Sequence, residues 1–221
     1  MRKKEKKIKK PWPTKDAMAQ VYAMKLWGDD ATRFYSGEGS HDPELVEPYV
    51  SKVATFLKSF KNKLRVCDLG CGDFNIGKQL VPYTQKYIAV DIVEDLIDYN
   101  KEHFKAEKVT FQCLDIATDN LPDADCVILR QVLQHLSNAE VQRILNKLHT
   151  YKYVIITEHI PEGDFTPNLD IISGQGIRLK KQSGLQVLAA PFHFKVKAHK
   201  QLLSVPLKNN KGMVVTTCYT I

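Results

Sequence analysis

The 221-residue sequence predicts an α/β fold in which a mostly parallel sheet carries helices on both faces. Three observations support this prediction. A short apolar segment, residues 64–69, leads directly into a glycine-rich turn, as in a βα unit that binds a ligand. Further short apolar segments alternate with amphipathic helical segments, which is typical of parallel sheets. The last two apolar segments, 199–207 and 213–221, are separated by a turn and indicate an antiparallel hairpin.

The glycine-rich turn lies in the stretch LRVCDLGCGDFNIG, which begins at Leu64 and ends at Gly77. Glycines at 70, 72 and 77 allow backbone torsions and a close ligand approach that a Cβ would obstruct, and a helix is expected to open at 75–76. A dinucleotide fingerprint needs its third glycine three residues after the second, whereas Gly77 comes five residues after Gly72. The turn is also flanked by Asp68 and Asp73. Two carboxylates repel a pyrophosphate but attract an ammonium and a sulfonium, so the turn favours S-adenosylmethionine over NAD.

The motif D-L-G-C-G, followed by Asp91 at the end of a second strand over 87–91, resembles the class I S-adenosylmethionine-dependent methyltransferases. The resemblance covers roughly Val46 to Ile221. It implies a Rossmann-like fold with a mostly parallel seven-stranded sheet and an antiparallel last strand. It also implies S-adenosylmethionine as cofactor and S-adenosylhomocysteine as product.

The resemblance further assigns roles to individual residues. The Asp91 carboxylate is expected to accept hydrogen bonds from both ribose hydroxyls, and Asp115 from the adenine amino group, with the adenine ring between Ile92 and Ile116. The segment that begins at Arg130 is expected to hold the methionine end of the cofactor and the acceptor. The expected cofactor-binding residues are Asp68, Gly70, Cys71, Gly72, Asp91, Ile92, Asp115, Ile116, Arg130 and Gln131.

The chain is expected to have three parts: a basic arm (1–13), an N-terminal helix with a lid-like segment (14–41), and the methyltransferase domain (42–221). Thr14 is expected to cap a helix that runs to Gly28. The following stretch, from Trp27 to His41, is rich in aromatic residues and glycine and is too irregular for regular structure. It fits a lid over the substrate mouth, and it equally fits a connector pinned by its aromatic side chains.

The methyltransferase domain is expected to open with Asp42 as the N-cap of a helix toward Phe60. Ser137 and Glu140 have the spacing of a capping box that starts another helix. The stretch from Pro161 to Pro191 lacks any pattern, which favours a binding insertion or a mobile segment. The remaining expected strands are 108–114, Ala124 to Leu129 and 151–160, and the remaining expected helix is 93–104.

Methyl transfer needs no metal, and none is expected here. Where the acceptor is a hydroxyl or an ammonium, a base must remove its proton, and the candidate catalytic residues are His135, His41, Glu158 and Tyr35. The sequence does not choose among them. After the fourth strand the chain has LRQV in place of an N/D-P-P-Y/F tetrapeptide, which argues against enzymes that methylate a planar amino nitrogen held by that motif.

The net charge of +7 is unevenly distributed. Residues 1–10 carry +6 and residues 171–221 carry +8 without a single acid, so the middle of the chain is acidic. This asymmetry suggests an anionic partner or substrate, although a solvated face and a mobile tail also explain it. The five cysteines have no paired spacing and are expected to be thiols packed as small hydrophobes.

No apolar run is long enough to span a membrane, and the N-terminus is too polar for a secretory signal, so a cytoplasmic location is expected. The leading hypothesis is a methyltransferase that acts on a small or medium-sized, possibly anionic, acceptor. Two alternatives stay open: an RNA methyltransferase that holds phosphates with its basic ends, and a non-catalytic domain that binds the cofactor and a partner. The sequence does not indicate an oligomeric state.

Overall fold

A computed structural model describes residues 11–29, 32–208 and 211–221. Its centre is a seven-stranded sheet with the order β3-β2-β1-β4-β5-β7-β6. Pairing is parallel from β3 to β5, and β7 runs antiparallel to both β5 and β6. The predicted mostly parallel sheet with an antiparallel last strand is therefore confirmed. The strands are β1 (Arg65–Leu69), β2 (Lys86–Asp91), β3 (Val109–Cys113), β4 (Cys126–Arg130), β5 (Tyr153–Ile160), β6 (Ala198–Pro206) and β7 (Met213–Thr220).

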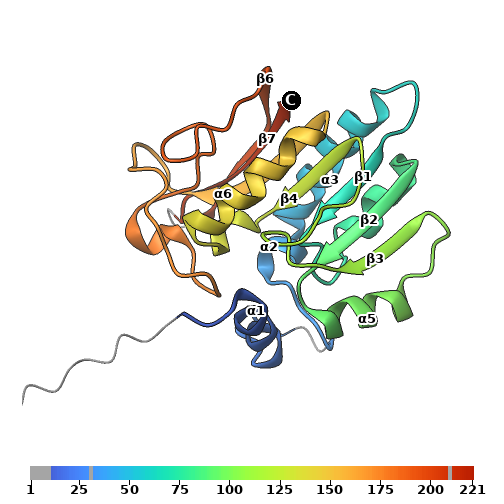
Figure 1. The fold of residues 1–221 in the computed structure, drawn as a ribbon, viewed down its shortest axis with the longest axis horizontal. Helices are drawn as coiled ribbons and strands as arrows, with labels where there is room; N and C mark the ends of the chain where they lie inside the picture. Colours follow the sequence, from blue (N-terminus) through green and yellow to red (C-terminus); the bar gives the residue numbers. More distant parts are fainter. Residues whose placement is uncertain (1–10, 30–31, 209–210) are drawn as a thin grey trace, which may run out of the picture.

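Successive residues of the central strands face opposite sides of the sheet, so each strand contributes to two hydrophobic cores. In β4, Val127 and Leu129 belong to the core beneath α6, whereas Cys126 and Ile128 belong to the core beneath α3. Figure 1 shows α3 and α6 on opposite faces of the sheet. The helices are α1 (Thr14–Ala23), α2 (Glu38–His41), α3 (Pro43–Lys58), α4 (Gly77–Leu80), α5 (Glu94–His103) and α6 (Asn138–Lys147), with 3-10 turns η1 (Val81–Tyr83), η2 (Leu133–His135), η3 (Leu148–Thr150) and η4 (Arg178–Lys181).

Two helix starts follow the predicted capping chemistry. The Asp42 carboxylate accepts a hydrogen bond from the Glu44 amide at 2.9 Å and begins α3. Ser137 and Glu140 form the expected capping box at the start of α6. Both caps satisfy backbone N–H groups that a helix leaves unpaired at its first turn.

The N-terminal helix differs from the prediction at both ends. Its N-cap position is Pro13 rather than Thr14, because the Thr14 hydroxyl donates to the carboxylate of Glu140 instead of capping its own helix. The helix ends at Ala23, five residues before Gly28, and the chain then turns. The segment expected to lack regular structure contains the short helix α2.

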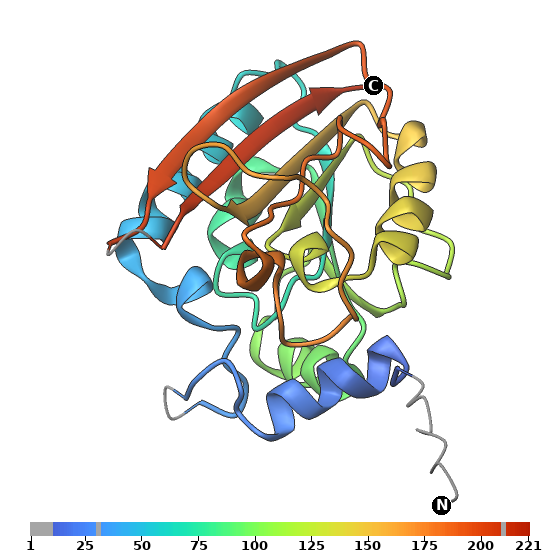
Figure 2. The same ribbon diagram turned by 90° about the vertical axis from the view of Figure 1, so that its left-hand side faces the viewer.

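The helix α1 lies across the edge of the sheet at which β1, β2 and β4 end (Figure 1). On the same side, the long connection between β5 and β6 folds back over the sheet edge and contains only η4 as a regular element (Figure 2). The basic arm, as far as residue 10, lies outside the described residues. In the described parts of the chain, no helix combines the length and the apolar character that a bilayer crossing requires.

Candidate functional site

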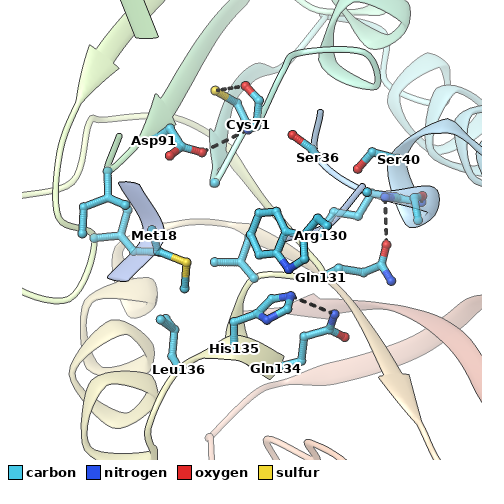
Figure 3. A pocket seen from close by; sticks show the side chains of 18 of the residues that line it. Met18, Ser36, Ser40, Cys71, Asp91, Arg130, Gln131, Gln134, His135 and Leu136 are labelled. Carbon is cyan, nitrogen blue, oxygen red and sulfur yellow. Dashed lines mark hydrogen bonds between the residues drawn. The ribbon is translucent and has the colours of Figure 1, made fainter. Parts of the chain in front are cut away.

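A cavity of about 510 Å³ opens at the carboxyl ends of β1, β2 and β4 and is covered by α1. Its size is within the ~300–1,000 Å³ of small-molecule sites, and its position is where open α/β sheets bind ligands. Figure 3 shows Asp91 and Cys71 on one side of it and Gln134 and His135 on the other. All of the predicted cofactor-binding residues line this cavity: Asp68, Gly70, Cys71, Gly72, Asp91, Ile92, Asp115, Ile116, Arg130 and Gln131.

The turn after β1 forms one wall of the cavity because two of its glycines have left-handed backbones. Gly70 has φ +87° and Gly72 has φ +54°, and a Cβ at either position would approach Val132 or Ser36 to less than 2.5 Å. Gly77 does not line the cavity. A Cβ there would meet the Phe74 ring at 2.3 Å, so this glycine permits packing of the turn rather than the close ligand approach that the sequence suggested.

Two buried carboxylates stand beside this turn. Asp68 accepts a hydrogen bond from the Tyr87 hydroxyl at 2.8 Å, and burial raises the pKa of its carboxyl to about 6. Asp91 accepts from the amides of Gly72 and Val93, each at 3.1 Å, and burial raises its pKa as well. Removing a carboxylate from water disfavours its charged form, so a cationic ligand group nearby would stabilise both residues.

The residues expected around an adenine ring lie together at the ends of β2 and β3. Ile92, Ile116 and Asp115 all line the cavity. One oxygen of Asp115 accepts from the Ala117 amide at 2.8 Å, so this residue also stabilises the turn in which it lies.

Arg130, the last residue of β4, is a buried cation on the opposite wall. Its guanidinium lies 4.7 Å above the Tyr49 ring and donates to the Gly39 carbonyl and, at 3.1 Å, to the Gln131 side chain. Its Nε has no hydrogen-bond partner among the described residues, and burial lowers the pKa of the guanidinium. Gln131 has φ +56°, a left-handed backbone conformation that non-glycine residues adopt only uncommonly.

His135, in η2, lines the cavity and packs against Trp27 with 5.1 Å between the ring centroids. Burial lowers the pKa of its imidazole to about 4, so the ring is neutral at pH 7. Gln134 fixes the tautomer: its Oε1 accepts from the His159 amide at 2.9 Å, which leaves its Nε2 to donate to His135 Nε2 at 3.3 Å. The proton therefore resides on Nδ1, which meets no partner of good geometry among the described residues.

The other three catalytic candidates are not among the residues that line this cavity. His41 contacts the Asp73 carboxylate at 2.7 Å, and the Tyr35 ring packs on the imidazole of His41. Glu158 is buried behind η2. Its carboxyl oxygens have no hydrogen-bond partner among the described residues, and burial raises its pKa to about 8 despite the nearby Arg178.

The lid-like segment is tied to the glycine turn through Asp73. The Asp73 carboxylate accepts from the Ser36 amide at 2.8 Å, and the Ser36 hydroxyl accepts from the Asp73 amide at 2.8 Å. That hydroxyl also contacts the hydroxyl of Tyr22, on α1, at 3.0 Å. Asp73 therefore fastens the covering segment, whereas the sequence suggested that it faces the ligand.

Several cavity residues were not identified from the sequence. Gln175, Gly176, Ile177 and Lys180 come from the long connection after β5, which the sequence indicated only as a possible binding insertion. Their position depends on Arg178, a fully buried side chain that donates to three backbone carbonyls of the loop around η2. A buried arginine has no sequence signal of its own, because arginine is mostly exposed.

No group of three or more His, Cys, Asp or Glu side chains in the described ranges is placed to hold a metal ion. The five cysteines are free thiols, four of them buried.

Comparisons with known proteins agree with this geometry. Residues 66–151 match a family model described as a methyltransferase domain. A search of curated proteins gives no match. Residues 66–151 are therefore similar in sequence to a methyltransferase domain, and the predicted resemblance to the class I S-adenosylmethionine-dependent enzymes is confirmed.

Solved structures share the fold. The N-methyltransferase NodS from Bradyrhizobium japonicum, in complex with S-adenosylhomocysteine, is similar over 93% of this chain and 99% of its own, with 12% identity and a TM-score of 0.66. Human N-acetylserotonin methyltransferase, in complex with S-adenosylmethionine, is similar over 82% of this chain, with 20% identity and a TM-score of 0.55. The match spans only 54% of the human enzyme. The cofactor class predicted from the glycine turn is the one that both neighbours hold.

Proposed function

We propose that this protein is an S-adenosylmethionine-dependent methyltransferase that acts on a small or medium-sized acceptor. The observation that carries the proposal is the cavity itself, since every residue that the motif implied for the cofactor lines it. A methyl acceptor then approaches from the side of η2 and the long connection after β5. The cytoplasmic location stays a prediction from the sequence.

The residues present suit this cofactor. Asp91 has a carboxylate at the end of β2 for the ribose hydroxyls, and the apolar side chains of Ile92 and Ile116 suit a flat adenine. Arg130 is a buried cation, and no carboxylate of the described chain is hydrogen-bonded to it. It therefore suits the carboxylate of the methionine moiety of the cofactor. When bound, the cofactor supplies an electrophilic methyl group, and the protein supplies position and exclusion of water.

We retain His135 among the four catalytic candidates because it alone lines the cavity. A histidine with a pKa of about 4 whose Nε2 already accepts from Gln134 is a poor proton acceptor at pH 7. Its Nδ1 is buried beside the backbone of Gly174, Gln175 and Gly176, so a ligand in the cavity meets the imidazole by packing against the ring. The proposed role of His135 is therefore to orient the acceptor.

Binding and turnover test the proposal in two steps. Calorimetry should show that the protein binds S-adenosylmethionine and S-adenosylhomocysteine but not NAD. Incubation with S-adenosylmethionine that carries a tritiated methyl group and a fractionated cell extract should then transfer label to the small-molecule fraction. NAD binding would reject the cofactor assignment. Cofactor binding without transfer to any fraction would favour the non-catalytic alternative, and label in nuclease-sensitive material would favour the RNA alternative.

A further inference from the structure

Lys180, in the long connection after β5, lines two cavities. It lines the cavity described above, and it also lines a second cavity of about 760 Å³ at the end of β5. The second cavity is formed by His159, Pro161, Glu162, Leu179, Lys180, Gln182, Lys211 and Gly212. Lys180, an exposed residue of η4, is therefore shared by the two cavities.

The charges around this position are mainly positive. Within the described chain, the ammonium groups of Lys180 and Lys211 make no hydrogen bond or ion pair, whereas Lys181 donates to the Asp170 carbonyl and Lys208 pairs with Glu44. Glu162 is the one acid among the described residues of the second cavity. A site with two unpaired ammonium groups and one carboxylate attracts an anion.

Lys180 is also held in a defined position relative to His135. Arg178, two residues earlier in η4, donates to the carbonyls of Leu133 at 3.2 Å and Leu136 at 2.8 Å and to the Asn138 side chain at 2.6 Å. These bonds fix η4 against η2, the turn that presents His135. An acid bound by Lys180 would therefore lie at a set distance from the acceptor end of the first cavity.

We propose that the methyl acceptor is a small molecule with a carboxylate or phosphate group, and that Lys180 binds this acid at the junction of the two cavities. The atom to be methylated then lies in the first cavity, beside His135. This inference rests on the proposed function and adds to it the chemical class of the acceptor.

Inorganic pyrophosphate is a suitable probe of the acid site. The protein is first saturated with S-adenosylhomocysteine, and pyrophosphate binding is then measured by calorimetry for wild type, Lys180→Met and Lys181→Met. Lys181 is the matched control, because it is the adjacent lysine of η4 and lines neither cavity. Loss of a charge-assisted hydrogen bond should weaken binding to Lys180→Met roughly tenfold, and Lys181→Met should bind like wild type. Equal affinities for wild type and Lys180→Met, or no pyrophosphate binding to wild type, would overturn the inference.

A second measurement tests whether the methylated product is a small acidic molecule or RNA. Tritiated methyl product from the extract should elute with the small molecules and be retained by an anion exchanger at neutral pH. Its rate of formation at low extract concentration should fall about tenfold in Lys180→Met, with the difference disappearing at saturation, since a substrate-binding cation acts on KM. A neutral or cationic product, or label confined to RNA, would overturn the inference while the proposed methyl transfer survived. Failure to bind S-adenosylhomocysteine would instead reject the proposed function itself.

Discussion

Asp91, at the end of β2, is the carboxylate proposed to bind the ribose of the cofactor. It accepts from the amides of Gly72 and Val93 and so joins the glycine turn to the start of α5. Replacing it by alanine should weaken S-adenosylhomocysteine binding by about 1.5–3 kcal/mol, because hydrogen bonds from two ribose hydroxyls to a charged acceptor are lost. Calorimetry measures the loss. Asp98→Ala, an exposed acid of α5 paired with Lys101, is the control and should bind normally; an Asp91→Ala variant with wild-type affinity would contradict the assignment.

His135 allows an orienting role to be separated from a basic one. His135→Asn and His135→Ala both remove the ring that packs on Trp27 and lines the cavity, so each should raise acceptor KM about tenfold. Neither substitution should reduce kcat a hundredfold. Loss of a general base costs about 10²–10⁴ in rate in both variants, so a collapse of kcat in His135→Asn would contradict the orienting role. Methyl incorporation over a range of extract concentrations distinguishes the two outcomes.

The helices, turns and strands that could be predicted are those whose structure depends on residues close to them in the sequence. The turn after β1, the capping box of α6 and the β6–β7 hairpin each depend on neighbouring residues, and the sequence predicted all three. The start of α1 depends on Glu140, a residue 126 positions away, so Thr14 could not be recognised as a tertiary contact. The connection after β5 has no periodicity, and its contribution to the cavity depends on the buried Arg178.

The covering segment from Trp27 to His41 is expected to respond to ligand. Ser36 and Asp73 hold it against the glycine turn through two backbone-to-side-chain hydrogen bonds, and Arg130 holds Gly39. Phe34 is buried in the core beneath α6 and Trp27 packs against that core, so opening without ligand should be confined to the part from Tyr35 to His41, which should become protected when the cavity is filled. Hydrogen exchange should show slower exchange of the amides from Tyr35 to His41 after addition of S-adenosylhomocysteine.

Two variants distinguish this lid from a connector. Ser36→Ala removes the hydroxyl that accepts from Asp73, so it should speed exchange of the covering segment and weaken cofactor binding. Thr55→Ala, on the exposed side of α3, removes a hydroxyl that donates only to its own helix and should change neither. Identical exchange of the segment with and without ligand would show that it is a fixed connector.

For the whole molecule, buried titratable groups should shape the dependence of stability on pH, and Glu158 and His135 are two of them. Glu158 keeps its proton in the folded state up to a pKa of about 8, because burial outweighs the attraction of Arg178. The unfolded chain releases that proton near its ordinary pKa of about 4.3. Between these values the folded state binds more protons than the unfolded state, so the free energy of unfolding falls as pH rises through this window. His135 contributes with the opposite sign, since its pKa of about 4 in the folded state makes stability fall as pH drops below its ordinary value of about 6.5.

Glu158→Gln isolates the first contribution because it keeps the size of the side chain and leaves His135 unchanged. Relative to wild type, the variant should gain stability as pH rises from 5 to 8, and each unit of pKa difference corresponds to ~1.4 kcal/mol. Urea unfolding at both pH values measures the change through the shift in transition midpoint. Glu102→Gln, an exposed glutamate of α5, should follow the wild-type profile. Parallel stability–pH profiles for wild type and Glu158→Gln would mean that Glu158 is ionised in the folded protein and paired with Arg178. The buried carboxyl would then stabilise the loop around η2 as an ion pair rather than as a neutral acid.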